Sequence, residues 1–412
     1  MTEPLSRRHL LHATLLAPAA AIASPPAPQH ATPPSRQDRL RLDARRLDTT
    51  LRGFVAQGRA VGVSALVWQD GATRYFGAAG HADRETQRPM TRETPVRIWS
   101  MTKPIAAFAL MRLWEAGRFR LDDPLALHLP EFERMRVHAD DGRGERPAQR
   151  SILVRDLLRH TAGLTYGMSD GPADRAFRAA DPFAKSRDLA AFTRAVAALP
   201  LRSEPGTEWH YSTAVDVQSR LVEVLAGEPF DVHVQRQVLQ PLGMTRTGWQ
   251  APADAPRIAT TYFHAEDGTV RREPEPPQGF ATGGFGLIAP IDDYLRFARC
   301  LLGEGQLDGV RLLQPATVRL MMTDQLDPAI THRHFLPEKG QMGFGLGGAV
   351  RVAPPASADE ARGSVGEYYW DGMASTLFWV DPAHALAVVF FTQKLPYDFS
   401  LHRELRRAVY GG

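Results

Sequence analysis

One short stretch of the sequence holds a serine and a lysine at a spacing suited to covalent catalysis. Ser100 stands three residues before Lys103, and an apolar run starts directly afterwards at Ile105. Residues three apart share one face of a helix, with Cβ atoms about 5–6 Å apart. A serine hydroxyl becomes a nucleophile when a base removes its proton, and a buried lysine with a neutral amine can be that base, whereas arginine stays protonated. The pair predicts a lysine-activated serine nucleophile.

Two later segments could complete such a site. Tyr211 lies in a turn, 205–213, that leads into a predicted helix near Val215, and a phenol close to a lysine can pass protons between a serine and a leaving group. The segment 369–374 ends one predicted strand and enters the next. All three segments, including the one with Ser100, also have a plain structural interpretation. Ser100 could be the N-cap of a helix, Tyr211 could pack at a loop corner, and 369–374 could be a hairpin turn.

The overall composition excludes several classes of protein. The 412 residues are 43% hydrophobic, which is enough for a large core, and 49 basic residues against 46 acidic ones give a charge of only +3. Nucleic-acid binding needs a concentrated basic field, so no nucleic-acid partner is expected. The single cysteine, Cys300, cannot form an intramolecular disulfide. The segment His332-Arg333-His334 offers two metal ligands at most, and neither a metal nor a cofactor is predicted.

The N-terminus has the pattern of an export signal. A paired arginine in Ser6-Arg7-Arg8 precedes an apolar run that ends with small residues at Ala23, which resembles a twin-arginine signal over residues 1–23. Residues 24–36 are rich in proline and predict a linker. Such a signal would export the protein to the periplasm or the medium and would be removed near Ala23. The alternative is a disordered tail, and no segment is apolar for long enough to span a membrane.

The remaining chain, 37–412, alternates between two kinds of pattern. Strand-like runs occur near both ends, at 61–68 and 73–79 and again at 344–352, 365–370, 375–380 and 385–392. Helical periodicity occurs at 39–55 and 401–409, and between the strands at 105–116, 154–158, 186–199, 215–226 and 291–302. The pattern predicts an α+β fold with one antiparallel sheet from both chain ends, 37–100 and 305–412, beside a helical lobe of about 101–304.

Together these segments resemble the serine β-lactamase and penicillin-binding-protein superfamily, in its class C β-lactamase and esterase branch. Residues 100–103 match its Ser-x-x-Lys box, 211–213 occupy its Tyr-x-Asn box and 370–372 its Lys-Thr-Gly box. The segments 154–164 and 283–287 are also similar to that family. The resemblance implies a β-lactamase-like fold, Ser100 as acylated nucleophile, Lys103 and Tyr211 as the proton-transfer pair, and the backbone N–H groups of Ser100 and Met373 as the oxyanion hole.

Departures from the family pattern bear on the substrate. Thr213 replaces an asparagine amide, and Trp370, Asp371 and Gly372 stand where the family has Lys-Thr-Gly. We expect these four residues to contact substrate. Without the box lysine, an anionic β-lactam meets no cation there, so the pattern favours a neutral acyl ester or amide. Asp371 either points to solvent or recognises a basic or polyhydroxylated substrate.

The sequence therefore predicts an exported serine hydrolase that forms an acyl-enzyme at Ser100. The bond is that of a carboxylic ester in a small molecule, and the acyl group passes to water or to an alcohol, as in a carboxylesterase or an acyltransferase. One alternative is a β-lactamase or D-Ala peptidase. An alternative of another class is a catalytically silent penicillin-binding-like protein that recognises a ligand.

Overall fold

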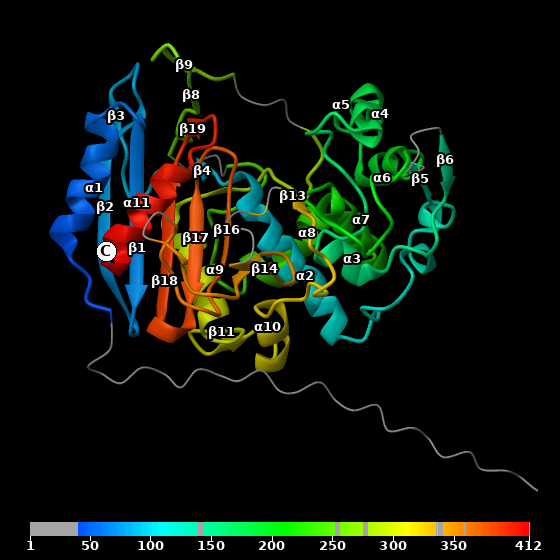
Figure 1. Cartoon of the computed structure of the whole chain (residues 1–412). Coiled ribbons are helices and arrows are strands. Elements are labelled where there is room, and N and C mark those ends of the chain that lie inside the picture. The colour runs from blue at the N-terminus through cyan, green and yellow to red at the C-terminus, as the bar shows by residue number, and fades with distance from the viewer. Residues whose placement is uncertain are drawn as a thin grey trace, which may run out of the picture. The chain divides into compact units, whose positions relative to one another are not determined.

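An eight-stranded antiparallel sheet is the framework of the structure, a computed structural model that describes residues 40–138, 144–251, 256–274, 279–334, 336, 341–357 and 360–411. The strand order is β14-β15-β16-β17-β18-β1-β2-β3. Because β18 pairs with β1, the sheet is built from both chain ends, which confirms the prediction (Figure 1). The predicted export signal 1–23 and linker 24–36 lie outside the described residues. The strands of this sheet are β1 Gly62–Gln69, β2 Ala72–Asp83, β3 Arg88–Pro89, β14 Met342–Phe344, β15 Ala349–Arg351, β16 Tyr368–Asp371, β17 Leu377–Asp381 and β18 Leu386–Thr392.

Local sequence accounts for the first hairpin. Gln69 pairs with Ala72, so that Asp70 and Gly71 alone form the turn between β1 and β2. Both turn residues have positive φ values, 50° and 79°. An Asp-Gly pair suits the two-residue turn whose twist matches that of the flanking strands.

Helices cover both faces of the sheet. On one face α1 (Ala44–Ala56) packs beside α11 (Phe399–Tyr410), and on the other α9 (Ile291–Leu302) packs on β17, β18 and β1. Successive residues of β18 point to these two layers, because Phe390 meets Phe54 of α1 while Phe391 meets Tyr294 of α9. Helix α9 therefore lies with the sheet, although its residues fall within the range 101–304 that the sequence assigned to the helical lobe.

Two strand predictions need correction. The run 344–352 was expected to be one strand, but it is a hairpin in which Phe344 ends β14 and Ala349 begins β15. Glycines permit the reversal: Gly347 has φ of 90°, and a Cβ atom there would lie 2.3 Å from the Cβ atom of Ala107. The strand expected at 365–370 begins later, at Tyr368, because Gly366 before it has φ of 89°.

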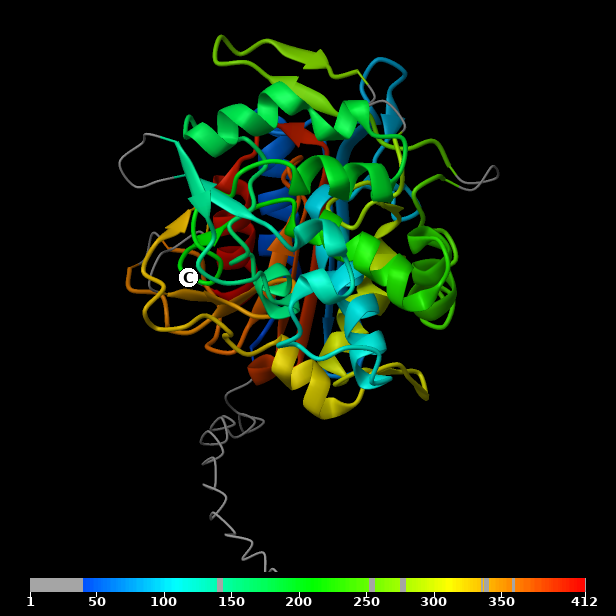
Figure 2. The same cartoon turned by 90° about the vertical axis from the view of Figure 1, so that its right-hand side faces the viewer.

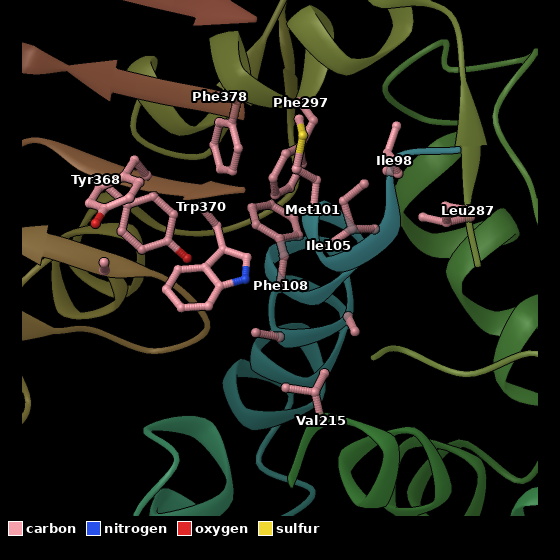
Figure 3. Close-up of a cluster of buried hydrophobic side chains, with 14 of the residues drawn as sticks. Ile98, Met101, Ile105, Phe108, Val215, Leu287, Phe297, Tyr368, Trp370 and Phe378 are labelled. Carbon is pink, nitrogen blue, oxygen red and sulfur yellow. The ribbon is translucent and has the colours of Figure 1, made fainter. Parts of the chain in front are cut away.

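Helix α2 (Thr102–Glu115) lies between the sheet and the remaining helices, which face the viewer in Figure 2. Its residues from Thr102 to Met111 are all buried, as expected for a helix with neighbours on every side. Figure 3 shows its Phe108 among side chains from the sheet and from α9, with the ring centroid 5.6 Å from that of Phe297. The other helices are α3 Val154–Leu158, α4 Pro172–Ala180, α5 Pro182–Lys185, α6 Leu189–Ala197, α7 Ala214–Ala226, α8 Phe230–Val234 and α10 Pro315–Met321.

Short two-stranded sheets and one three-stranded sheet join loops outside the main sheet. They are β4 Val96–Arg97 with β10 Ile288–Ala289, β5 Arg136–His138 with β6 Glu145–Pro147, β7 Trp209–His210 with β13 Arg333–His334, β11 Gln306–Leu307 with β12 Val310–Arg311, and β8 Tyr262–His264 with β9 Val270–Arg272 and β19 Lys394–Leu395. Among the residues that the structure describes, no helix combines the length and the apolar character needed to cross a bilayer.

Candidate active site

Ser100 lies in a single 3-10 turn, Trp99–Met101, that leads directly into α2. Trp99 has a φ of 50°, a left-handed conformation that a non-glycine residue adopts only when its surroundings hold it there. Lys103 is the second residue of α2, and its Nζ atom lies 3.2 Å from the Ser100 Oγ atom. The helix start thus brings the two side chains into the contact that their spacing predicts.

The amine of Lys103 is deeply buried. The side chain is only 2% exposed, and its Nζ atom lies 4.6 Å from the ring centre of Tyr211 and 5.2 Å from that of Tyr166. Burial lowers the pKa of Lys103 from 10.5 to about 7, although the carboxylates of Asp216 and Asp371 act in the opposite direction. Near neutral pH, a large share of the lysine therefore carries no charge and can accept a proton.

A glycine loop holds this amine in place. Lys103 Nζ donates a 2.6 Å hydrogen bond to the carbonyl oxygen of Gly284. That carbonyl can come so close because Gly284 has no side chain: a Cβ atom there would lie 2.2 Å from a carboxylate oxygen of Asp216. The neighbouring Gly283 N–H donates to Ser219 Oγ of α7 at 2.7 Å. The segment 283–287, which resembles the family in sequence, thus orients the Lys103 amine.

Tyr211 contacts the same serine oxygen as Lys103. Its hydroxyl donates to Ser100 Oγ at 2.6 Å. Burial raises the pKa of Tyr211, so the phenol keeps its proton at neutral pH. With Lys103 neutral, the serine hydroxyl can donate to the lysine lone pair while it accepts from Tyr211. This division of donors and acceptors allows Lys103 to act as a base and Tyr211 as a proton donor.

A buried carboxylate behind Lys103 is a feature that the sequence analysis missed. Asp216 of α7 has no exposed surface, and it accepts hydrogen bonds from the Tyr166 hydroxyl at 2.7 Å and from Thr282 Oγ1 at 2.5 Å. Burial raises its pKa, and the nearby Lys103 opposes this. The sequence did carry one signal, because Asp216 stands between Val215 and Val217 on a helix that is otherwise apolar in this turn.

The third box lies beside the serine, and its aromatic residue packs on Tyr211. The Trp370 side chain of β16 is only 5% exposed, and its ring centroid lies 5.5 Å from that of Tyr211. The glycine of this box, Gly372, lies close to the segment that precedes Ser100: a Cβ atom there would lie 2.6 Å from the carbonyl oxygen of Ile98. Met373, at the tip of the turn between β16 and β17, has a half-exposed side chain.

Asp371 and Thr213 are placed differently from these residues. The Asp371 side chain has partners within the protein: its carboxylate accepts a 2.6 Å hydrogen bond from the Tyr397 hydroxyl and lies 3.9 Å from His402 Nδ1. Burial raises the pKa of Asp371 to about 6. Thr213, the residue before α7, has no exposed surface. Contact of either side chain with substrate stays a prediction.

His160 has a structural position. His160 is 1% exposed, its Nδ1 atom accepts from the Ser212 N–H at 3.3 Å, and its ring packs on that of Tyr211. It therefore supports the Tyr211 loop.

Across the described ranges of the chain, no group of three or more His, Cys, Asp or Glu side chains is arranged to hold a metal ion.

Comparison with known proteins places this geometry in a family context. The family model for "Beta-lactamase" matches residues 47–410. Protein Rv1367c of Mycobacterium tuberculosis is 37% identical over 84% of this chain and 89% of its own length. Esterase EstB of Burkholderia gladioli is 31% identical over 89% and 95%, respectively. The solved structure of EstCE1, "a hydrolase with promiscuous acyltransferase activity", superposes with a TM-score of 0.77 at 30% identity and covers 89% of this chain and 98% of that one.

Proposed function

The chain belongs to the beta-lactamase family, and from this we propose that it is a serine esterase that carries the acyl group of a neutral ester on Ser100. The observation that carries the proposal is the contact of one serine oxygen with two proton-transfer groups. Ser100 Oγ lies 3.2 Å from Lys103 Nζ and 2.6 Å from the Tyr211 oxygen. The esterase and hydrolase names of its relatives support the same reaction class.

In the acylation step, neutral Lys103 takes the hydroxyl proton of Ser100 as Oγ attacks the ester carbonyl carbon. The negative oxygen that forms is stabilised by the backbone N–H groups of Ser100 and Met373. Tyr211 gives its proton to the departing alkoxide, and the Lys103 ammonium returns one to the phenolate. The ester C–O bond breaks, the acyl–Oγ bond forms, and the serine proton leaves, in net terms, on the alcohol.

Deacylation repeats these roles in reverse. Lys103 takes the phenol proton of Tyr211 while the phenolate accepts the proton of a water molecule or of an alcohol, whose oxygen attacks the acyl carbon. The Lys103 ammonium then gives its proton to Ser100 Oγ as it leaves. Attack by water gives a carboxylic acid, and attack by an alcohol gives a new ester. The promiscuous acyltransferase activity of the hydrolase EstCE1 supports the second outcome as a side reaction.

The substrate class follows from the third box. Trp370 stands where the family pattern has a lysine, and its indole packs against Tyr211. A neutral ester loses nothing when the box cation is absent, whereas the carboxylate of a β-lactam loses its partner. Asp371, one residue further on, adds a negative charge in this region above its pKa of about 6. We therefore expect ester turnover to exceed cephalosporin turnover.

Hydrolysis of a short-chain nitrophenyl ester and of a chromogenic cephalosporin tests the proposal. The wild type is compared with Ser100→Ala and with Ser151→Ala, a matched control at an exposed serine. Ester turnover that persists in Ser151→Ala and is lost in Ser100→Ala is the expected result. Efficient cephalosporin turnover would contradict the substrate assignment. If Ser100→Ala kept both activities, the assignment of Ser100 as the nucleophile would be wrong.

The N-terminal pattern supports export as a further part of this proposal. The paired Arg7 and Arg8 precede an apolar run that ends at Ala23, which is the arrangement of a twin-arginine signal. The double substitution Arg7→Lys, Arg8→Lys keeps the charge and removes the motif. We expect wild-type activity in the periplasmic or secreted fraction and retention of the variant in the cytoplasm. Equal distribution of the two proteins would contradict the signal.

A further inference from the structure

The turn that carries Met373 contains a residue in an unfavourable backbone conformation. Ser375 has a φ of 64°, in the left-handed region that glycine adopts readily and other residues adopt at a cost of roughly 1–3 kcal/mol. Within the turn, its N–H donates to the Gly372 carbonyl oxygen at 2.8 Å, and the Gly372 N–H donates to that of Thr376 at 2.9 Å. Such a conformation persists only where the surrounding structure holds it.

The C-terminal segment supplies that hold. Ser375 Oγ donates to the carbonyl oxygen of Lys394 at 3.2 Å and accepts from the Asp398 N–H at 3.0 Å. The carbonyl oxygen of Ser375 accepts from His402 Nε2 at 2.9 Å. Ser375 and His402 are both buried. The backbone and the side chain of Ser375 are therefore fixed by residues that follow it by 19 to 27 positions.

The same segment also holds the other end of the turn. The Tyr397 hydroxyl donates to the Asp371 carboxylate at 2.6 Å and lies 3.3 Å from His402 Nδ1. Because His402 Nε2 carries the proton given to the Ser375 carbonyl, its Nδ1 atom is an acceptor, and the single Tyr397 hydroxyl proton lies between this nitrogen and the nearer Asp371 carboxylate. A chain of contacts thus runs from Asp371 through Tyr397 and His402 to Ser375 and closes around the turn. We call Asp371, Tyr397 and His402 the turn clamp.

The turn so enclosed lies directly against the nucleophile segment. Gly372 approaches the Ile98 carbonyl oxygen closely enough that a Cβ atom there would lie 2.6 Å from it, and Thr376 Oγ1 donates to the same carbonyl at 3.3 Å. A shift of the turn would therefore move the Met373 N–H relative to Ser100. An oxyanion donor is effective only within a few tenths of an ångström of its hydrogen-bonding position.

We propose that Tyr397 and His402 are positioning residues, which hold the 372–375 turn so that the Met373 N–H faces the oxyanion formed at Ser100. The inference rests on the proposed function. Both residues act through their contacts with Asp371 and Ser375. When one clamp contact is removed, the Met373 N–H remains present but points less accurately at the oxyanion. The expected loss is thus smaller than the roughly hundredfold or greater loss seen when an oxyanion donor is removed.

The test compares two tyrosines near the C-terminus. Tyr397→Phe removes the clamp hydroxyl and keeps the ring, and Tyr410→Phe is the matched control, since its hydroxyl donates to Asp381 at 2.7 Å, away from the turn. We expect Tyr397→Phe to lower kcat for the nitrophenyl ester about tenfold with KM within about twofold, because the oxyanion exists only in the transition state. Tyr410→Phe should reduce thermal stability without lowering kcat.

A second pair of variants separates positioning from folding. His402→Leu removes the donor to the Ser375 carbonyl, whereas His402→Gln keeps an N–H of similar reach. We expect kcat to fall in the first and to recover most of its value in the second. Unchanged kcat in Tyr397→Phe, or an equal fall in Tyr410→Phe, would overturn the inference while Ser100→Ala remains inactive. Turnover that does not need Ser100 would overturn the proposed function, and this inference with it.

Discussion

The buried amine of Lys103 predicts how ester hydrolysis depends on pH. Lys103 must be neutral to accept the serine proton, and burial lowers its pKa to about 7. With that value, about one tenth of the lysine is neutral at pH 6 and about nine tenths at pH 8. The quotient kcat/KM should therefore rise roughly tenfold between these two pH values, and it should change little from pH 8 to pH 9.

The assay follows nitrophenyl ester hydrolysis from pH 5 to pH 9 at the wavelength where nitrophenol and nitrophenolate absorb equally. Lys103→Arg places a permanent cation at the same position and should remain almost inactive at every pH, because a guanidinium supplies no neutral base. Lys185→Arg, at an exposed lysine, is the matched control and should follow the wild-type profile.

Three results would refute this reasoning. A midpoint near 10 would mean that burial does not lower the lysine pKa in the free enzyme. A flat profile between pH 6 and pH 8 would mean that no group with a pKa near 7 controls acylation. Substantial activity in Lys103→Arg would mean that another residue is the base.

Four further variants probe Lys103 and its surroundings. Gly284→Ala should lower kcat/KM by tenfold or more in the same ester assay, because the new Cβ atom would lie 2.2 Å from an Asp216 oxygen and displace the carbonyl that holds the amine. Asp216→Asn should move the pH midpoint below the wild-type value, since the carboxylate favours the ammonium, and Tyr166→Phe, which keeps the charge, should move it less. Lys103→Met should be inactive but more stable in thermal or denaturant unfolding. The pKa of this lysine is 10.5 in the unfolded chain and about 7 in the fold, so its protonation destabilises the fold below pH 10.5 and most fully below pH 7. At pH 7, removing it should raise the free energy of unfolding by about 4 kcal/mol.

The sequence predicted those parts of the structure that depend on local pattern. The strands of the two chain ends show the alternation or the short apolar runs of buried strands, and β1 and β18 pair as expected. Ser100 and Lys103 are three residues apart, so helix geometry alone brings them together. The three glycines within 345–348 carried the signal for a hairpin, and the expectation of one strand there failed because β propensity was given more weight than those glycines.

The residues that support the site could not be predicted, because they meet only through tertiary packing. Asp216 and Thr282 are 66 residues apart, and Tyr397 is 26 residues from Asp371. No periodicity links such pairs in one sequence. Asp371 illustrates the consequence: its type suggested a residue that faces solvent or substrate, whereas the fold places a tyrosine hydroxyl 2.6 Å from its carboxylate.

The loss of the box lysine also changes how the base is tuned. A second ammonium near Lys103 would lower its pKa by repulsion, but Trp370 brings no charge, and the charged groups that act on Lys103, Asp216 and Asp371, both raise its pKa. Burial is therefore what brings the pKa of Lys103 close to neutral pH. The aromatic rings of Tyr166 and Tyr211 exclude water from it without adding charge. Trp370 in place of the box lysine thus has two expected effects. An anionic substrate loses its cationic partner, and the pKa of Lys103 depends on how well the packed aromatic rings exclude water.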